Sequence, residues 1–345
     1  MAELVIKGGV IIDAAGERSG DVVIDGGRVV AVGTGLSADR VIDAGGCVVS
    51  PAFVDLHTHL REPGREEAET IEAASRSAVL GGFGAVMAMP DTSPAIDSAA
   101  AVRDVQALGR DALCDICVAG AITVGRDGDR LTPMAEMAAL GVRLFTDGDR
   151  GVQDDRLMRR ALEYASGLGV TLAQHCEAAA LAEGGHMNEG AVSSWLGIPG
   201  IPAEAEELML MRDVTLSRLT GARVHFLHLS TAGSVGILRA AKSSGLPVTA
   251  AAAPHHFALT EQAVSTFDPV FKVSPPLRTE GDVDAIKLAL HDGVFDAIAS
   301  DHAPHEPHMK ELPFDEAPPG VTGLETAFSV AAASTTHGAS GSRTG

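Results

Sequence analysis

The sequence predicts an α/β protein, namely a (β/α)8 TIM barrel with a small N-terminal β domain. Three observations carry this prediction. The chain has 345 residues, which suits one large barrel with a small appendage. From residue 51 onward, short apolar runs alternate with longer stretches of helical periodicity, as in repeated βα units. Residues 1–50 instead contain β-branched runs between Gly-rich turns, which is typical of short strands.

The first 50 residues predict a small β-sandwich-like domain. β-branched runs occur at 4–13, 20–33 and 40–50. The pairs Asp25-Gly26 and Gly8-Gly9 have the composition of tight hairpin turns. The alternative is that these runs are the first strands of a larger sheet.

Eight strand candidates follow Pro51, and helical patterns such as 66–82, 154–169 and 231–245 lie between them. Eight βα units favour a closed barrel over the alternative, a doubly wound open sheet. No glycine-rich dinucleotide fingerprint follows the first of these strands, which weakens the alternative. The predicted strands are 52–57, 84–89, 114–122, 142–146, 170–175, 223–228, 246–253 and 296–300.

The last helical pattern, at 323–334, leads into a tail rich in Ser, Gly and Thr that has no apolar periodicity. We expect the barrel to span residues 51–335 and residues 336–345 to be disordered.

Composition disfavours several function classes. Lys and Arg number 26 against 46 Asp and Glu, so the formal net charge is −20. This charge disfavours nucleic acid and anionic membranes as partners, whereas a local cation can still capture a small anion. The chain has no apolar run of about 18 residues, and its start has no signal-peptide pattern. Its four cysteines are too few for a disulfide framework, so we expect a cytoplasmic protein.

Residues that can bind metals follow five of the predicted strands. They are His57 and His59 at the first strand, Asp147 and Asp149 at the fourth, His175 at the fifth, His228 at the sixth and Asp301 at the eighth. Barrel strands end at one common rim, and alternate residues of a strand share a face, so these side chains should converge. Imidazole and carboxylate groups suit Zn²⁺, and this number of ligands predicts two metals.

Several motifs carry a family resemblance. Residues 51–98, beginning PAFVDLHTHLREPG, resemble the dihydroorotase signature within the amidohydrolase superfamily, and SDHAPHEPHMK (300–310) and PPGVTGLETAF (318–328) resemble its C-terminal signature. APHHFAL (253–259) and VSPPLR (273–278) also match. His255 and His256 in APHHFAL could either support the site or have a structural role. The resemblance covers roughly residues 3–335. HLREPG together with DHAPH favours dihydroorotases over hydantoinases and allantoinases.

The resemblance is closest to the bacterial type in which an aspartate bridges two zinc ions. In keeping with this, no Lys occurs between Lys7 and Lys242, so a carboxylated lysine cannot follow the fourth strand. The resemblance implies a barrel of the metal-dependent hydrolase type with two Zn²⁺ per chain. Its implied first zinc ligands are His57, His59 and Asp301, its second are His175 and His228, and a carboxylate after the fourth strand bridges both.

The resemblance also implies a catalytic and a substrate-binding set. Asp301 would act as the general acid–base group. Arg61 would bind the substrate carboxylate, because its planar fork matches a carboxylate. The remaining substrate-binding positions are Asp91, Ser274, His305, Pro319 and Gly320.

Three positions depart from the family pattern. FTDGD stands where FTDDG is usual, so Gly148 takes the place of the bridging Asp, and Asp149 is the preferred substitute over Asp147. Asp91 stands where Asn is usual, and its carboxylate would repel a substrate carboxylate unless Asp91 is protonated or turned towards Arg61. Ser replaces Asn at position 274, which shortens a hydrogen-bonding arm.

The predicted function is zinc-dependent hydrolysis of a small anionic cyclic amide, as in a dihydroorotase of pyrimidine biosynthesis. One alternative is a hydantoinase- or allantoinase-like cyclic amidase. Another is a catalytically impaired scaffold partner of aspartate carbamoyltransferase. The expected assembly is a homo-oligomer or a complex with aspartate carbamoyltransferase. Family members continue for about 70–80 residues that complete the small β domain, so we expect this domain to be incomplete here, without the C-terminal β return.

Overall fold

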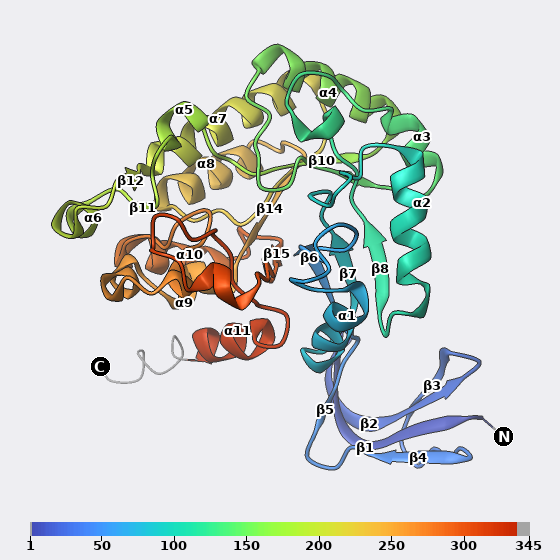
Figure 1. Ribbon diagram of the computed structural model, residues 1–345. Helices are drawn as coiled ribbons and strands as arrows, with labels where there is room; N and C mark the ends of the chain where they lie inside the picture. The colour runs from blue at the N-terminus through green and yellow to red at the C-terminus, as the bar shows by residue number, and fades with distance from the viewer. Residues whose placement is uncertain (1, 337–345) are drawn as a thin grey trace. The chain divides into compact units, whose positions relative to one another are not determined.

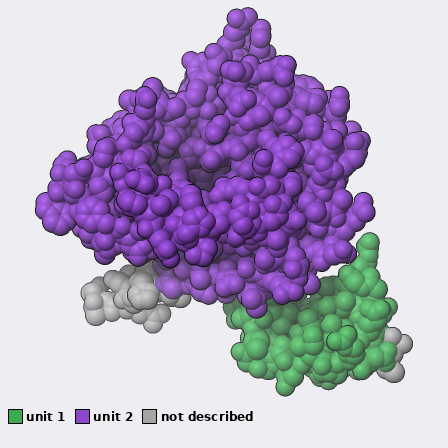
Figure 2. Space-filling model, viewed as in Figure 1, with its two compact units in different colours: residues 1–53 green, residues 54–345 purple. Residues whose placement is uncertain are grey.

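The computed structural model describes residues 2–336, and the chain divides into two compact units between Phe53 and Val54. Figure 2 shows them in separate colours. The expected disordered tail lies outside the described residues, except for Thr336, which ends the last helix. No helix among residues 2–336 combines the length and apolar character needed to cross a membrane.

The first unit is a small sheet of five strands, drawn in blue in Figure 1. Its strands are β1 (Leu4–Asp13), β2 (Gly16–Asp25), β3 (Arg28–Gly33), β4 (Arg40–Asp43) and β5 (Val48–Val49). β1, β2 and β3 pair antiparallel in order, and β4 and β5 both pair parallel to β1. Val29, Val41 and Val48 are each about 60% exposed in this sheet.

One of the two predicted hairpin turns is wrong. The turn after Asp25 joins β2 to β3, with Gly26 and Gly27 both at positive φ. Gly8-Gly9 instead lies inside β1, where the register against β2 shifts between Ile6 and Gly9. Gly8 has a φ of 76°, so the glycine pair makes a bulge and not a turn.

The second unit is the predicted barrel, and all eight predicted strands are present. They form two blocks of hydrogen-bonded strands, β6-β7-β8 and β9-β10-β13-β14-β15. Parallel bridges connect the blocks at both seams, Gly120 to Phe145 on one side and Thr58 to His302 on the other. The strands are β6 (Phe53–Thr58), β7 (Phe83–Ala88), β8 (Asp115–Val118), β9 (Leu144–Phe145), β10 (Thr171–Gln174), β13 (Val224–Phe226), β14 (Val248–Ala252) and β15 (Ala297–Ile298).

Helices alternate with the barrel strands along the chain, and α2 (Ala99–Leu108), for example, runs beside β8 (Figure 1). Helix α4 buries Met158, Ala161, Leu162 and Ala165, the i, i+3, i+4, i+7 stripe of a helix that covers a sheet. Helix α1 begins at Ile71, later than the pattern at 66–82 predicts, because Thr70 caps it. The principal helices are α1 (Ile71–Leu80), α2 (Ala99–Leu108), α3 (Met134–Ala139), α4 (Asp155–Leu168), α7 (Ala203–Thr220), α8 (Ala232–Ser243), α10 (Glu280–His291) and α11 (Ala327–Thr336).

The segment between β10 and α7, an excursion from the barrel, contains a two-stranded parallel sheet. A short helix follows β14. The elements are α5 (Ala179–Ala182), β11 (Met187–Asn188), α6 (Ala191–Leu196), β12 (Gly200–Ile201) and α9 (Pro254–Ala258).

Candidate active site

Buried imidazoles from three strands converge at the carboxyl-terminal rim of the barrel. His57 ends β6 together with Thr58, and its Nε2 lies 3.1 Å from Nε2 of His59. His175 follows β10, and its Nδ1 lies 3.4 Å from Nε2 of His228, which follows β13. The rings of His57 and His228 are 5.0 Å apart, so the two pairs form one cluster.

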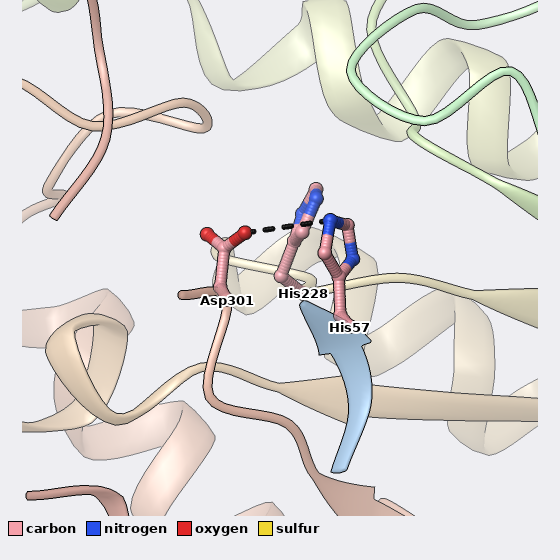
Figure 3. A group of neighbouring side chains, drawn as sticks. All are labelled: His57, His228 and Asp301. Atoms are coloured by element: carbon pink, nitrogen blue, oxygen red, sulfur yellow. Dashed lines mark ion pairs between the residues drawn. The ribbon is translucent and has the colours of Figure 1, made fainter. Parts of the chain in front are cut away.

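Asp301, which follows β15, completes this cluster. Its Oδ1 lies 3.5 Å from Nε2 of His57. His57, His228 and Asp301 each offer a ligand atom, and these atoms lie within 4.8 Å of one another (Figure 3). Three ligands from β6, β13 and β15 that point to one place form the start of a site for a divalent cation.

His57 and His228 have the protonation that suits a metal, whereas His175 differs, because burial is outweighed by Glu177, 3.9 Å from its Nε2, and its pKa is raised. Burial, with the neighbouring imidazole of His59, lowers the pKa of His57 well below its usual value. Burial also lowers the pKa of His228, helped by His57. Neutral imidazoles are the form that binds metals. Nε2 of His57 faces His59 and Asp301, and Nε2 of His228 faces Nδ1 of His175, so these ring nitrogens are the atoms that could hold a metal.

Asp301 is a buried carboxyl group with a second imidazole beside it. It is buried, and burial raises its pKa to about 7. Its Oδ2 lies 3.6 Å from Nε2 of His255, a buried residue of α9. The structure therefore places His255 at the site, whereas burial and the 2.9 Å contact of His256 Nε2 with the carbonyl of Pro275 place His256 in a supporting position.

Three of the candidate residues have backbone angles that favour glycine. The φ angles of Arg61, His228 and Asp301 are 64°, 21° and 51°. A non-glycine residue in this region costs free energy that the surrounding structure must supply, and such residues cluster at functional sites. Their coincidence with the candidate site supports a functional reason for the conformation.

The surroundings of Asp301 hold its backbone in place. Nδ1 of His302 accepts a hydrogen bond from the backbone N–H of Gly323 (3.1 Å), and its Nε2 lies 2.9 Å from Glu69. The backbone carbonyl of His302 accepts from the N–H of His59 (2.8 Å), so the ends of β15 and β6 are tied together.

The loop after His228 is held by a buried carboxylate. Oε1 of Glu206, on α7, accepts from the backbone N–H of Ser230 at 3.0 Å. Arg278 donates to Oγ of Ser230 (3.1 Å) and to Asn188 Oδ1 and the Ile201 carbonyl (both 2.9 Å). These contacts link the rim of the barrel to the excursion that contains β11 and β12.

A hollow of about 330 Å³ opens beside the cluster. Its wall contains every substrate-binding residue that the resemblance implies, together with His59 and Asp301. They are Arg61, Asp91, Ser274, His305, Pro319 and Gly320.

Asp91 is turned towards Arg61, one of the two arrangements that the sequence allowed. Its Oδ2 lies 2.9 Å from Nη1 of Arg61 and 2.8 Å from Nδ1 of His59. Burial by itself would raise the pKa of Asp91, but His59 and Arg61 hold this pKa well below its ordinary value. Asp91 is therefore ionised.

The loop that contains Pro319 and Gly320 is held by hydrogen bonds to its backbone. The Pro319 carbonyl accepts from Nε2 of His305 (2.8 Å), and the Gly320 N–H donates to the Lys272 carbonyl (2.9 Å). Burial lowers the pKa of His305 to about 4, so this imidazole is neutral.

The two carboxylates after β9 point to different neighbours. Asp147 is buried and accepts from the backbone N–H groups of Ile122 (2.8 Å) and Thr123 (3.0 Å). Asp149 forms an ion pair with Arg126, and its side chain is 57% exposed. Asp149, unlike Asp147, lines the hollow of the candidate site.

Arg126 is a member of this wall that the sequence did not predict. It lies in the loop after β8, has a φ of 60° and lines the hollow. Its Nε also donates to the Asp147 carbonyl at 2.9 Å. A lone Arg in a Gly- and Asp-rich loop carries no spacing signal, and its partner is 23 residues away in the sequence.

Comparison with known proteins gives the family. A family model described as dihydro-orotase-like matches residues 46–234. The chain is 49% identical over 282 residues to a dihydroorotase of Pelotomaculum thermopropionicum, which covers 82% of this chain and 66% of that protein. It is 49% identical over 288 residues to a dihydroorotase of Streptomyces coelicolor, with 83% and 67% covered. The chain thus spans about two thirds of the length of these curated relatives.

Solved structures agree on the fold. The L-hydantoinase (dihydropyrimidinase) of Arthrobacter aurescens superposes with a TM-score of 0.85 at 23% identity, over 96% of this chain and 76% of that one. A D-hydantoinase gives 0.82 at 23% identity, over 97% and 77%. At this identity the likeness bears on the fold alone, and it confirms the predicted barrel with an N-terminal β unit. Sequence identity of 49% over more than four fifths of the chain shows which family this barrel represents, and the protein belongs to the dihydroorotase family.

Proposed function

We propose that this protein is a zinc-dependent cyclic amidohydrolase that reversibly hydrolyses (S)-dihydroorotate to N-carbamoyl-L-aspartate, a reaction of pyrimidine biosynthesis. One observation carries the proposal. The buried cluster of His57, His228 and Asp301 lies beside a hollow whose wall contains Arg61, in a chain of the dihydroorotase family.

The chain's residues divide into two zinc sites in this proposal. His57, His59 and Asp301 would hold one Zn²⁺, and His175 and His228 a second. Asp149 is the proposed bridging ligand, and it must leave Arg126 to serve as one. Bound zinc supplies a Lewis acid and lowers the pKa of a bound water to about 7.

Asp301 moves the proton in the proposed reaction. As the oxygen of water joins the ring carbonyl carbon, Asp301 accepts a proton from that water. The amide C–N bond then breaks, and Asp301 delivers the proton to the ring nitrogen that leaves.

Arg61 and the walls of the hollow orient the ring. The Arg61 guanidinium is a planar donor for the carboxylate of dihydroorotate. Ser274 and the segment that contains Pro319 and Gly320 line the same hollow and would contact the ring. Holding the ring in one orientation converts the attack of water into an effectively unimolecular step.

Zinc content and turnover together test the proposal. Purified protein should contain about two zinc ions per chain and hydrolyse dihydroorotate, as the bound-water chemistry of zinc requires. His57→Ala should lose both zinc and turnover, with Lys287→Ala on the outer helix α10 as a surface control. Full zinc content with turnover of hydantoin and none of dihydroorotate would support the cyclic amidase alternative. Absence of zinc and of turnover would support the scaffold alternative.

We also propose a cytoplasmic location and either a homo-oligomer or a complex with aspartate carbamoyltransferase. The location is supported by four cysteines that are all free in the structure. Sedimentation of the protein alone and with aspartate carbamoyltransferase would test the assembly.

A further inference from the structure

Arg61 and Asp91 form a largely buried ion pair in the wall of the hollow. The two side chains are 5% and 9% exposed, and Nη1 of Arg61 lies 2.9 Å from Oδ2 of Asp91. Nε of Arg61 donates to the carbonyl of Pro304, also at 2.9 Å. Two of the three guanidinium nitrogens are thus engaged by the protein itself.

Asp91 is anchored from a second side. Nδ1 of His59 lies 2.8 Å from the same Oδ2 atom of Asp91. Moving Asp91 away from Arg61 would also break the contact with His59. Asp91 therefore stays against Arg61 when a ligand enters, and the ligand must share the guanidinium with it.

This arrangement sets the charge that a ligand meets. A ligand carboxylate beside Arg61 comes close to the carboxylate of Asp91, and two like charges that face each other in a site repel. Burial strengthens the repulsion, because the effective dielectric constant is low. A ring without a carboxylate meets no such repulsion.

The other cations that line the hollow are Arg65, Arg126 and Arg150, and Arg150 is exposed, so solvent screens its charge. Arg126 and Asp149 both line the hollow and carry opposite charges, so together they add no net charge to it. Nη2 of Arg65 lies 3.9 Å from Oε2 of Glu306, and the Arg65 side chain is 36% exposed, so solvent screens its charge. Asp91 is therefore the charged side chain of the hollow that directly contacts Arg61.

We propose that Asp91 is a specificity-determining residue, which occupies the Arg61 guanidinium and lowers the preference of the site for a ring that carries a carboxylate over the same ring without one. The inference rests on the proposed function, because it concerns the substrate pocket of that reaction.

Binding of orotate and of uracil tests the inference, because the two planar rings differ in one carboxylate. Calorimetry on zinc-loaded protein gives the ratio of the two affinities in the wild type and in Asp91→Asn, which keeps the shape of the side chain and removes its charge. We expect orotate to bind about tenfold or more tightly to the variant, since one like-charge contact is removed. The affinity for uracil should change by less than about threefold, because uracil has no carboxylate to meet Asp91.

The design controls for two other effects. Asp91 contacts His59, so zinc is measured in each protein, and the orotate-to-uracil ratio cancels any change in metal content that affects both rings. Glu66→Gln removes a carboxylate from the same loop as Arg61, where Glu66 is exposed and accepts from the Gly64 N–H, and should leave the ratio unchanged.

An orotate-to-uracil ratio that is equal in the wild type and Asp91→Asn overturns the inference, as does the absence of orotate binding to both proteins. These outcomes are distinct from failure of the proposed function, which is judged by turnover of dihydroorotate in the wild type. The binding ratio needs no turnover.

Discussion

His225 should make the barrel sensitive to acid. It lies in β13, is 5% exposed, and its Nδ1 lies 2.9 Å from Oγ1 of Thr249. Its Nε2 is buried without a hydrogen-bond partner among the described residues. Burial lowers the pKa of His225 to about 4.

The sign and size of the effect follow from this pKa. The unfolded chain binds a proton on this imidazole near pH 6.5, and the folded protein does so only near pH 4, so stability falls as the pH falls through this window. For pKa values of about 6.5 unfolded and about 4 folded, lowering the pH from 7 to 5 removes about 2 kcal/mol of stability.

The assay is urea unfolding of wild type and His225→Asn at pH 7 and pH 5, followed by circular dichroism with equal zinc content. At pH 7 the variant should be less stable by about 1 kcal/mol, the worth of a buried hydrogen bond. Between pH 7 and pH 5 it should lose about 2 kcal/mol less than the wild type. His291→Asn, at an exposed position on α10, is the control. An equal loss in wild type and His225→Asn would refute the reasoning.

Three further predictions concern the site and its support. In Asp301→Asn, kcat for dihydroorotate should fall about 10²–10⁴-fold because the proton acceptor is lost. Steady-state kinetics at measured zinc content test this, and a kcat within about tenfold of the wild-type value would contradict it. Arg61→Gln should raise KM for dihydroorotate about 10- to 100-fold through loss of a charge-assisted contact, with a smaller effect on a neutral cyclic amide; equal effects on both substrates would exclude a carboxylate-binding role. Arg278→Met should lower the free energy of unfolding by about 3–5 kcal/mol, because Asn188 and the Ile201 carbonyl lose their buried donor. Chemical denaturation measures this change. A loss below about 1 kcal/mol, which is typical of a surface substitution, would contradict the prediction.

The barrel was predictable because its signal is local and repeated. Each strand is a short apolar run and each helix an amphipathic stretch, so all eight strands were found in the sequence. Gly8-Gly9 was misjudged for the same reason, since a bulge and a turn need the same positive φ from glycine. Only the pairing of β1 with β2 distinguishes them.

The candidate metal residues were also predictable, because parallel strands of a barrel bring their carboxyl ends to one rim. His57, His175 and His228 could therefore be grouped without knowing any contact. The roles of Asp147 and Asp149 could not be separated in this way. Both lie in one short loop, and their partners, Thr123 and Arg126, come from the end of a different strand.

By itself, the sequence determined the family, the order of strands and helices, and the residue types that gather at the rim, because these depend on local periodicity and on short motifs. The tertiary structure decided which charges meet. The pairing of Arg61 with Asp91, 30 residues apart, is one example, and the placement of His255 against Asp301 is another. Electrostatic energy depends on separation in space and on burial, and neither is encoded in the spacing of residues along a chain.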